Sequence, residues 1–156
     1  MTVYLVRHAK AGDRLQWTRP DELRPLSSTG QQQAVGLLDL FHDTHLERIL
    51  SSPAVRCLET MAPLAGARGL PIEPVEALGE GNDLGEVLIL VRKHLDHGAV
   101  FCSHGDIIPA LVNHYVKEGA RLVGQARCAK GSTWTLDGDA CGEVTSVRYL
   151  PPPETL

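Results

Sequence analysis

Two short apolar runs, each followed at once by polar residues that include a histidine, constrain the fold of this chain most strongly. Residues 3–6 lead directly into Arg7 and His8, and residues 99–102 lead into a serine followed by His104. Unbroken apolar runs of this length are typical of strands buried within a parallel sheet. In such sheets the carboxyl ends of the strands open into one crevice, where ligands bind. We therefore expect His8 and His104 to share that crevice.

The rest of the chain alternates between predicted helices and strands. Capping residues and apolar periodicity predict helices at residues 29–42, 53–66, 82–97 and 107–116. Short strands are predicted at residues 48–51, 70–75 and 99–102, and a hairpin at residues 128–136 and 143–150. This order predicts a single domain over residues 1–156, a three-layer α/β/α fold with a mostly parallel central sheet. The final residues, PPPETL, are expected to fray.

Composition and charge exclude several classes of protein. A chain of 156 residues with 43% hydrophobic and 22% charged residues is typical of a globular domain. Its net charge of −4 argues against binding to nucleic acid, which needs a basic surface. The first residues lack the apolar core of a signal peptide, and no stretch approaches the roughly 18 apolar residues of a membrane span. We expect a cytoplasmic protein that binds neither nucleic acid nor membrane.

The cysteines and the remaining histidines predict neither disulfides nor a metal site. Four widely spaced cysteines form no CxxC pair, so reduced and mostly buried thiols are expected at Cys57, Cys102, Cys128 and Cys141. The pairs His42/His45 and His94/His97 have no third cysteine or histidine ligand nearby. We therefore expect no metal and no cofactor.

Arg56 has an unusual position for an arginine. It falls in the first turn of the second predicted helix, where the positive end of the helix dipole disfavours a cation by about a few tenths of a kcal/mol. An arginine placed against this preference predicts contact with an anion. The alternative is an exposed helical arginine with no such contact.

Histidine and arginine side chains together indicate phosphoryl chemistry. Neutral imidazole is a competent nucleophile near physiological pH, because its ordinary pKa is about 6.5. Arginine offers planar, bidentate donors to phosphoryl oxygens, a role that suits Arg7 and Arg56. A protonated His104 would add another donor, and the nearby arginines should keep His8 neutral. These residues predict hydrolysis in two steps through a phosphohistidine on His8.

Three segments carry a specific resemblance to a known family. LVRHAKAG, SSPAVRCLET and CSHGDIIP, in this order and spacing, resemble the histidine phosphatase superfamily, also called phosphoglycerate mutase-like. The resemblance covers residues 1–116 and implies a metal-independent phosphatase. It also implies that His8 is the nucleophile and that Arg7, Arg56 and His104 form the phosphate pocket.

A fourth stretch refines the resemblance. DELRPLSSTGQQQA, the RHA triplet and the small size are most similar to the SixA-type branch of phosphohistidine phosphatases. That similarity implies that Arg24 reaches the phosphate pocket and that the substrate is a phosphohistidine-bearing protein. The same stretch, with Trp17 and Asp21, is also similar to phosphatase domains fused to Nudix hydrolases that act on nucleotides. A small phosphorylated metabolite or nucleotide is therefore the alternative substrate.

The resemblance leaves the proton donor open. Many members of the superfamily have a carboxylic acid that protonates the leaving oxygen, in a loop ahead of the strand that bears the second histidine. Glu80 lies in such a loop, with Asp83 as the substitute, and a solvated loop carboxylate is the alternative for Glu80. SixA-type enzymes resemble a minimal version without an obvious acid. A phosphoramidate substrate tolerates the absence of an acid because its leaving group departs more easily than an alkoxide.

Two other functions are open on the same fold. A non-catalytic phosphate-binding module is disfavoured because His8 and His104 are both intact. A mutase normally needs longer insertions around the pocket, and this chain has little room for them.

Overall fold

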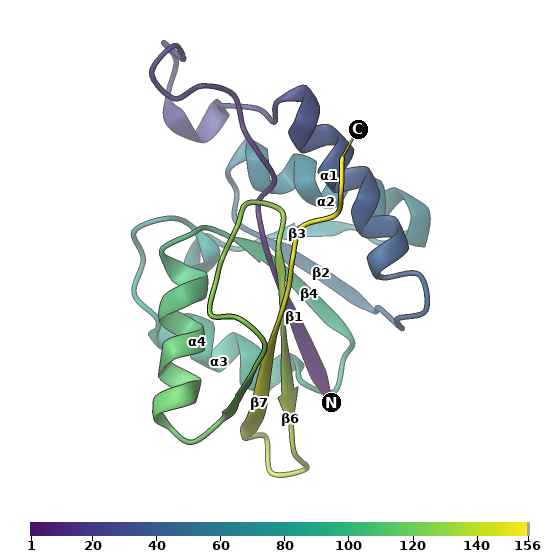
Figure 1. The fold of residues 1–156 in the computed structure, drawn as a ribbon, viewed down its shortest axis with the longest axis vertical. Coiled ribbons are helices and arrows are strands. Elements are labelled where there is room, and N and C mark those ends of the chain that lie inside the picture. Colours follow the sequence, from purple (N-terminus) through teal and green to yellow (C-terminus); the bar gives the residue numbers. More distant parts are fainter. Residues whose placement is uncertain (156) are drawn as a thin grey trace.

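The structure is a computed structural model that describes residues 1–155. Its elements are, in chain order, β1 (Thr2–Arg7), η1 (Asp21–Leu23), α1 (Ser28–Leu40), β2 (Arg48–Ser51), α2 (Val55–Arg68), β3 (Ile72–Pro74), η2 (Glu76–Leu78), α3 (Gly85–His94), β4 (Ala99–Ser103), α4 (Ile107–Lys117), β5 (Arg121–Val123), β6 (Thr133–Gly138) and β7 (Val144–Leu150). A central sheet has helices on both of its faces (Figure 1). Within the described residues, no helix is both long and apolar enough to cross a membrane.

The strands form one mixed sheet in the order β3-β2-β4-β1-β6-β7-β5. The strands β3, β2, β4 and β1 run parallel to one another, so their carboxyl ends lie at the same edge. β6 runs antiparallel to β1 and to β7, and β5 pairs in parallel with β7. The predicted, mostly parallel sheet is confirmed, and β5 is an edge strand that the sequence patterns did not reveal.

Helices cover both faces of the sheet because its central strands are apolar on both sides. Val3 and Leu5 of β1 belong to a core cluster that contains buried residues of α3 and α4. Val6 belongs to a second cluster, on the opposite face, with buried residues of α1 and α2. Successive side chains of a strand point to opposite faces, so an unbroken apolar run requires cover on both. The expected three-layer α/β/α fold is confirmed.

The second helix, α2, begins at Val55 rather than at Pro53. The residues before it contact the segment that follows β4 instead of joining the helix. The Ser52 hydroxyl accepts a hydrogen bond from the Ala54 N–H at 3.3 Å and lies 2.8 Å from Nε2 of His104. The Ser52 side chain is therefore turned toward a histidine that is distant in the sequence, which the local pattern could not reveal.

The third helix, α3, is shorter than the predicted range 82–97. The Asn82 side-chain amide donates to the Glu76 carbonyl at 2.8 Å, which keeps Asn82 in the preceding loop. Asp83 accepts a hydrogen bond from the Gly85 N–H at 2.9 Å. Polar side chains that bond to nearby backbone compete with helix formation, so they delay the start of α3.

The predicted hairpin forms, but its strands are shorter than expected. β6 and β7 pair from Thr133 opposite Leu150 onward. Residues 128–132 fold back over the end of β1 instead of extending β6. The Gly131 N–H lies 3.1 Å from the carbonyl oxygens of both Arg7 and His8. This loop therefore helps to form the edge of the sheet where ligands are expected.

The expected fraying of the C-terminal tail is wrong for the described residues 151–155. The tail runs alongside α1 (Figure 1). A Cβ added to Gly36 of α1 would lie 2.4 Å from the Cβ of Pro153, so the tail rests directly on the helix. A glycine leaves the space into which the proline ring packs. Leu156 lies outside the described residues.

All four cysteines are free within the described part of the chain. Cys57 and Cys102 are buried as expected, whereas Cys128 is half-buried and Cys141 is exposed. Cys141 lies in the turn between β6 and β7, where a thiol has no core to enter. The expectation of buried thiols therefore holds for two of the four.

Gly30 allows α1 to approach the chain that follows β1. A Cβ added to Gly30 would lie 1.9 Å from the carbonyl oxygen of Lys10. The same carbonyl accepts hydrogen bonds from the N–H and the hydroxyl of Ser27, at 3.0 and 3.1 Å. Ser27 is the N-cap of α1. The start of α1 is therefore fixed against the segment just beyond His8.

Replacing Gly30 by alanine should lower the free energy of unfolding by about 2 kcal/mol or more, because the new methyl group overlaps a backbone atom. Urea unfolding measures the change. Gly66→Ala is the matched control, since Gly66 lies inside α2 with no atom within 4 Å of an added Cβ. That exchange should raise the stability by about 0.5 to 1 kcal/mol. Unchanged stability of the Gly30 variant would contradict the close approach.

Candidate active site

His8 lies just beyond β1, where its N–H donates to the Ser103 carbonyl at 3.0 Å and extends the pairing with β4. The residue is 5% exposed, and Nδ1 lies 2.8 Å from the carbonyl oxygen of Ala9. A carbonyl can only accept, so Nδ1 carries the ring proton and Nε2 keeps a free lone pair. His8 lines a cavity and can offer an unprotonated nitrogen there.

Burial keeps the His8 ring neutral. It is the largest of the causes that lower the pKa of His8 to about 3, and the charges of Arg56 and Arg7 act in the same direction, as that of a protonated His104 does. The hydrogen bond to Ala9 opposes them without outweighing them. The predicted neutrality therefore follows first from desolvation and only second from the arginines.

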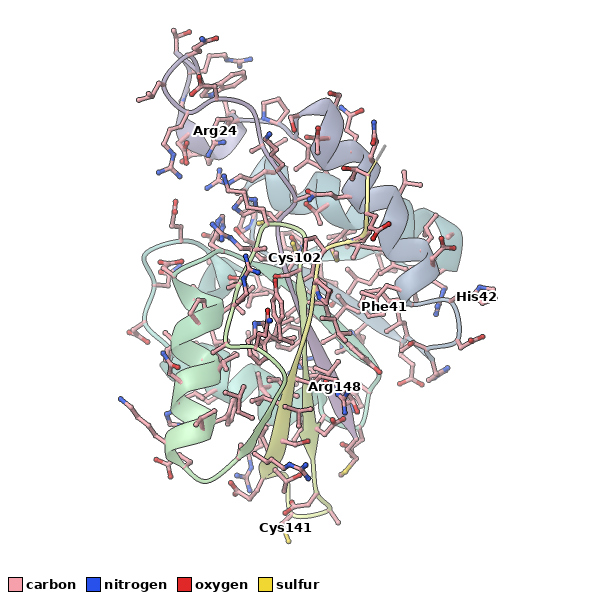
Figure 2. The ribbon with its side chains drawn as sticks, in the orientation of Figure 1. Arg24, Phe41, His42, Cys102, Cys141 and Arg148 are labelled. Atoms are coloured by element: carbon pink, nitrogen blue, oxygen red, sulfur yellow. The ribbon has the colours of Figure 1, made fainter. Side chains whose placement is uncertain are left out.

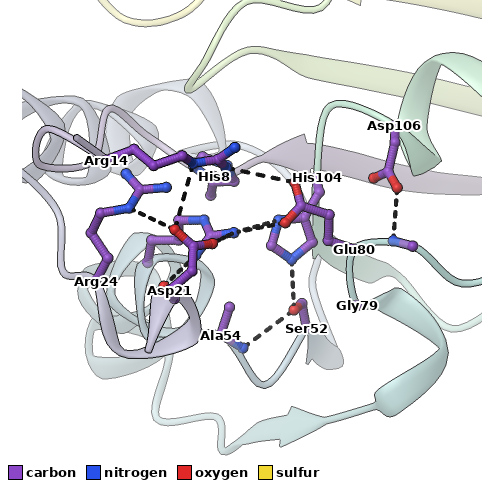
Figure 3. Close-up of polar contacts among 12 residues, drawn as sticks. His8, Arg14, Asp21, Arg24, Ser52, Ala54, Gly79, Glu80, His104 and Asp106 are labelled. Atoms are coloured by element: carbon purple, nitrogen blue, oxygen red, sulfur yellow. Dashed lines mark hydrogen bonds and ion pairs between the residues drawn. The ribbon is translucent and has the colours of Figure 1, made fainter. Parts of the chain in front are cut away.

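His104 follows β4 and lies beside His8, with the ring centroids 5.3 Å apart. It is 1% exposed, and its Nε2 lies 2.8 Å from the Ser52 hydroxyl while Nδ1 lies 3.4 Å from an Arg56 nitrogen. Arginine only donates, so Nδ1 accepts from Arg56 and Nε2 donates to Ser52. The two strand ends thus bring both histidines into one crevice, as predicted (Figure 3).

Arg56, in the first turn of α2, is 1% exposed, which rules out an exposed helical arginine. One terminal nitrogen donates to the Asp21 carbonyl at 3.0 Å. The other lies 3.2 Å from the Asp21 carboxylate and 3.4 Å from that of Glu80. Among residues 1–155, Nε of Arg56 has no hydrogen-bond partner. The side chain does contact anions, in agreement with its placement against the helix dipole.

Arg24 comes from the segment between β1 and α1, which projects beyond the sheet (Figure 2). It is only 4% exposed, because its guanidinium group folds back onto the same segment. Nε donates to the Asp21 carboxylate at 3.1 Å, and a terminal nitrogen donates to the Gly12 carbonyl at 2.8 Å. Arg24 and Arg56 therefore meet at one carboxylate.

Asp21 lies at the centre of the site, although the sequence patterns gave it no role of its own. Its carboxylate lies 3.1 Å from Arg24, 3.2 Å from Arg56 and 3.5 Å from Arg14 (Figure 3). Partial burial acts to raise the pKa of Asp21, but the hydrogen bond from Arg24 and the charges of the three arginines outweigh it and lower the pKa. The available signal was the three-residue spacing from Arg24. Asp21 acts as an internal counter-ion.

Of the two candidate acids, the structure brings Glu80 to the site and leaves Asp83 outside. The Glu80 side chain is 49% exposed and lies 3.4 Å from Arg56 and 3.8 Å from Arg14. Asp83 is exposed, and its carboxylate binds the Gly85 N–H at the start of α3. A carboxylate paired with two arginines accepts hydrogen bonds. In this arrangement Glu80 is an ion-pair partner of the arginines, and its role as the proton donor stays a prediction.

Arg7 reaches the site over the backbone of Gly105. A Cβ added to Gly105 would lie 2.7 Å from the central carbon of the Arg7 guanidinium group, so glycine leaves the space for it. One terminal nitrogen of Arg7 donates to the Cys128 carbonyl at 2.6 Å. Nε is buried and has no hydrogen-bond partner within the described chain. Arg7 therefore has donor capacity left for a ligand.

Asp106 caps α4, and it also holds the loop that carries Glu80. One oxygen accepts from the Ile107 N–H at 2.8 Å. The other accepts from the Gly81 N–H, also at 2.8 Å (Figure 3). Gly81 is the neighbour of Glu80 in the chain. This contact therefore links the loop that carries Glu80 to the segment between β4 and α4 that carries His104.

Two adjoining cavities share the Glu80 side chain. The smaller, of about 570 Å³, we call the acidic lobe; its charged lining residues are Asp21, Glu22, Arg56, Glu76 and Glu80, and His104 lies there too. The larger, of about 870 Å³, we call the basic lobe; His8 lies there with Arg7, Lys10, Arg14, Arg24 and Lys130. The arrangement suits a ligand whose negative charge enters the basic lobe.

The remaining histidines line neither lobe. The His42 and His45 side chains are each 81% exposed, and His94 packs against His97 and Phe101. Among residues 1–155, no group of three or more histidine, cysteine or acidic side chains is placed to hold a metal ion.

Comparison with known sequences identifies a family, and curated relatives also match the chain. The sequence model of the histidine phosphatase superfamily (branch 1) matches residues 3–87. An 8-oxo-(d)GTP phosphatase of Mycolicibacterium smegmatis (strain ATCC 700084 / mc(2)155) is 28% identical over 158 residues, a match that covers 98% of this chain and 49% of the relative. The chain therefore spans about half the length of that relative.

Solved structures share the fold at low sequence identity. The protein histidine phosphatase SixA complexed with tungstate matches with a TM-score of 0.73 and 20% identity, covering 98% of this chain and 96% of SixA. A mycobacterial glucosyl-3-phosphoglycerate phosphatase matches with a TM-score of 0.65 and 18% identity, covering 96% and 95% of the two chains. At these identities the likeness establishes the fold.

At pH 5 the His8 ring should be neutral with its proton on Nδ1, because its pKa is lowered to about 3. A histidine with the ordinary pKa of about 6.5 is mostly charged at that pH. NMR titration of the histidine ring nitrogens measures the difference directly. A His8 midpoint near 6.5 would contradict the burial of this ring.

The same lowered pKa should make stability fall on acidification. Between about pH 6.5 and 3 the unfolded chain binds a proton at His8 that the folded chain does not, so the free energy of unfolding falls as the pH falls through this window. His8→Asn removes the titrating group. Its stability should therefore decline less than that of the wild type over the same window.

Proposed function

Because the chain belongs to the histidine phosphatase superfamily, we propose that it hydrolyses a phosphorylated substrate through a phosphohistidine on His8. The observation that carries the proposal is the hydrogen bond from Nδ1 to Ala9, which leaves Nε2 of a neutral ring free for attack. The arginine donors that surround the ring favour a phosphoryl group as the electrophile. Intact His8 and His104 favour an enzyme over a phosphate-binding module.

In the proposed first step, Nε2 of His8 attacks phosphorus. The bond from phosphorus to the leaving atom breaks, and the leaving atom keeps the electron pair. Arg7, Arg24 and Arg56 donate to the equatorial phosphoryl oxygens, on which charge is spread in the transition state. These donors supply the positive charge, so the proposal needs no metal ion.

Asp21 prepares this pocket for an anion. It holds Arg24 and Arg56 at one point before substrate binds. The incoming phosphoryl group then competes with the Asp21 carboxylate for the same guanidinium groups. Because the donors are already oriented, little reorganisation is needed in the transition state.

In the proposed second step, water attacks the phosphorus of the phosphohistidine. The P–N bond breaks, its electron pair returns to Nε2, and inorganic phosphate leaves with the water oxygen. The hydrogen bond from Nδ1 to Ala9 holds the ring in one orientation through both steps. Once Arg56 turns to the substrate and Nδ1 of His104 takes up a proton from solvent, His104 donates to the same phosphoryl group.

Two substrate classes fit this mechanism. A phosphohistidine-bearing protein is supported by the likeness to SixA and by Glu80, which is paired with arginines instead of placed as a free acid. A phosphorylated small molecule, including a nucleotide, is the alternative and is supported by the relative named for 8-oxo-(d)GTP. A general acid that protonates the leaving oxygen would matter most for a substrate with an alkoxide leaving group.

His8→Ala should abolish turnover of p-nitrophenyl phosphate, because it removes the nucleophile. Rapid mixing of the wild type with a radiolabelled phosphorylated substrate should trap label that is stable in alkali and lost in acid, as expected of phosphohistidine. His42→Ala, at an exposed histidine, is the control and should keep full activity. Retention of more than a few per cent activity in the His8 variant, or label on another residue, would overturn the assignment.

Arg56→Ala should lower kcat/KM by about 100-fold or more, the loss typical of one transition-state donor. Arg148→Ala removes an exposed arginine of β7 and should have no effect. Thermal unfolding of both variants separates lost catalysis from lost folding. A folded Arg56 variant with near-normal kcat/KM would limit Arg56 to a structural role.

A further inference from the structure

The basic lobe carries more positive charge than a single phosphoryl group requires. Besides Arg7 and Arg24, it is lined by Arg14, Lys10 and Lys130. The pocket proposed for the transferred phosphoryl group uses the arginines near His8. It leaves the two lysines without an assigned ligand, although they line the same cavity as the nucleophile.

The acidic residues that line the basic lobe do not neutralise these lysines. Asp13 and Asp106 accept hydrogen bonds from nearby backbone N–H groups, and Glu80 pairs with arginines. Among residues 1–155, no carboxylate forms an ion pair with Lys10 or Lys130. Both ammonium groups are therefore available to an anion from outside the protein.

A glutamine of α1 holds the two lysines next to each other. The Gln33 side-chain oxygen accepts from the Lys10 N–H at 2.9 Å, and its nitrogen donates to the Lys130 carbonyl at 3.3 Å. The next residue, Gly131, bonds to the His8 carbonyl at 3.1 Å. The backbone of Lys10 lies close to the proposed nucleophile because the two residues are near in the sequence. The backbone of Lys130 is held there by hydrogen bonds of Gln33 and Gly131.

The surroundings of Lys130 are strongly cationic. Burial lowers the pKa of Lys130, and the charges of Arg7, Arg24, Arg14 and Lys10 lower it further. Cations gathered in this way repel one another and create a positive potential in the lobe. An anion bound among them relieves that repulsion.

We propose that Lys10 and Lys130 bind a second phosphate group, next to the phosphoryl group that His8 accepts. The preferred substrate is then a diphosphate, in which the two phosphate groups share a bridging oxygen. This inference rests on the proposed function of His8 and narrows its substrate class to a phosphoanhydride. Hydrolysis of a phosphohistidine-bearing protein is the competing outcome of the test.

Both steps balance for such a substrate without a protein acid. Nε2 of His8 attacks the terminal phosphorus, the bond to the bridging oxygen breaks, and its electron pair stays on the departing phosphate, which the lysines hold. Water then attacks the phosphohistidine, the P–N electron pair returns to Nε2, and inorganic phosphate departs. A phosphate is a weaker base than an alkoxide, so it can leave unprotonated. The pairing of Glu80 with Arg56 and Arg14 agrees with this chemistry.

The first test compares two non-hydrolysable inhibitors of p-nitrophenyl phosphate turnover, methylenediphosphonate and methylphosphonate. The wild type should bind the diphosphonate about 100-fold more tightly, since each lysine adds one charge-assisted contact worth about tenfold. Lys10→Gln and Lys130→Gln should each reduce that preference by about tenfold. Lys117→Gln, at an exposed lysine of α4 outside the lobe, is the control and should leave it unchanged.

An equal affinity of the wild type for both inhibitors would overturn the second phosphate site. So would lysine variants that keep the wild-type preference. Neither result would contradict the proposed function, because p-nitrophenyl phosphate turnover and its loss in His8→Ala report on the nucleophile alone. The two proposals therefore fail separately.

The second test compares kcat/KM for a nucleoside diphosphate, the matching monophosphate and a phosphohistidine-bearing protein. The diphosphate should be hydrolysed at least about tenfold more efficiently than the monophosphate, and the Lys10 and Lys130 variants should lose that advantage. A higher value for the phosphohistidine-bearing protein, unaffected by the lysine variants, would contradict the inference and favour the protein substrate.

Discussion

The parallel pairing of β1 with β4 is the constraint on which the rest of the site depends. It sets Arg7 opposite Ser103 and lets the His8 N–H bond to the Ser103 carbonyl, so His8 and His104 leave the sheet as neighbours. Both strands are buried on both faces. A shift of register by one residue would turn core side chains to the wrong face. The packing of the core therefore fixes the points at which both histidines leave the sheet.

Charge balance is the second requirement of this site. Arg24 and Arg56 are nearly fully buried, and a buried cation without a partner is strongly destabilising. Asp21 supplies the negative charge in the free protein, and a phosphoryl group would supply it in the proposed complex. The same need for negative charge favours an anionic ligand in the proposed complex.

Local sequence patterns predicted those features of the structure that depend on residues close together in the sequence. The apolar runs at 3–6 and 99–102 predicted central strands, and the conflict of Arg56 with the helix dipole predicted its contact with anions. The contact of Asp21 with Arg56 and the bridging by Gln33 could not be predicted in the same way. They are polar contacts between segments distant in sequence, and no periodicity marks them.

The place of β1 in the sheet has a consequence for synthesis on the ribosome. Both neighbours of β1, the strands β4 and β6, come from later parts of the chain. The loop of Gly131, which bonds to the His8 carbonyl, emerges later still than β4. The nascent strand that ends in His8 therefore has no partner until the second half of the chain appears. His8, the proposed nucleophile, is therefore synthesised before the strands and the loop that position it.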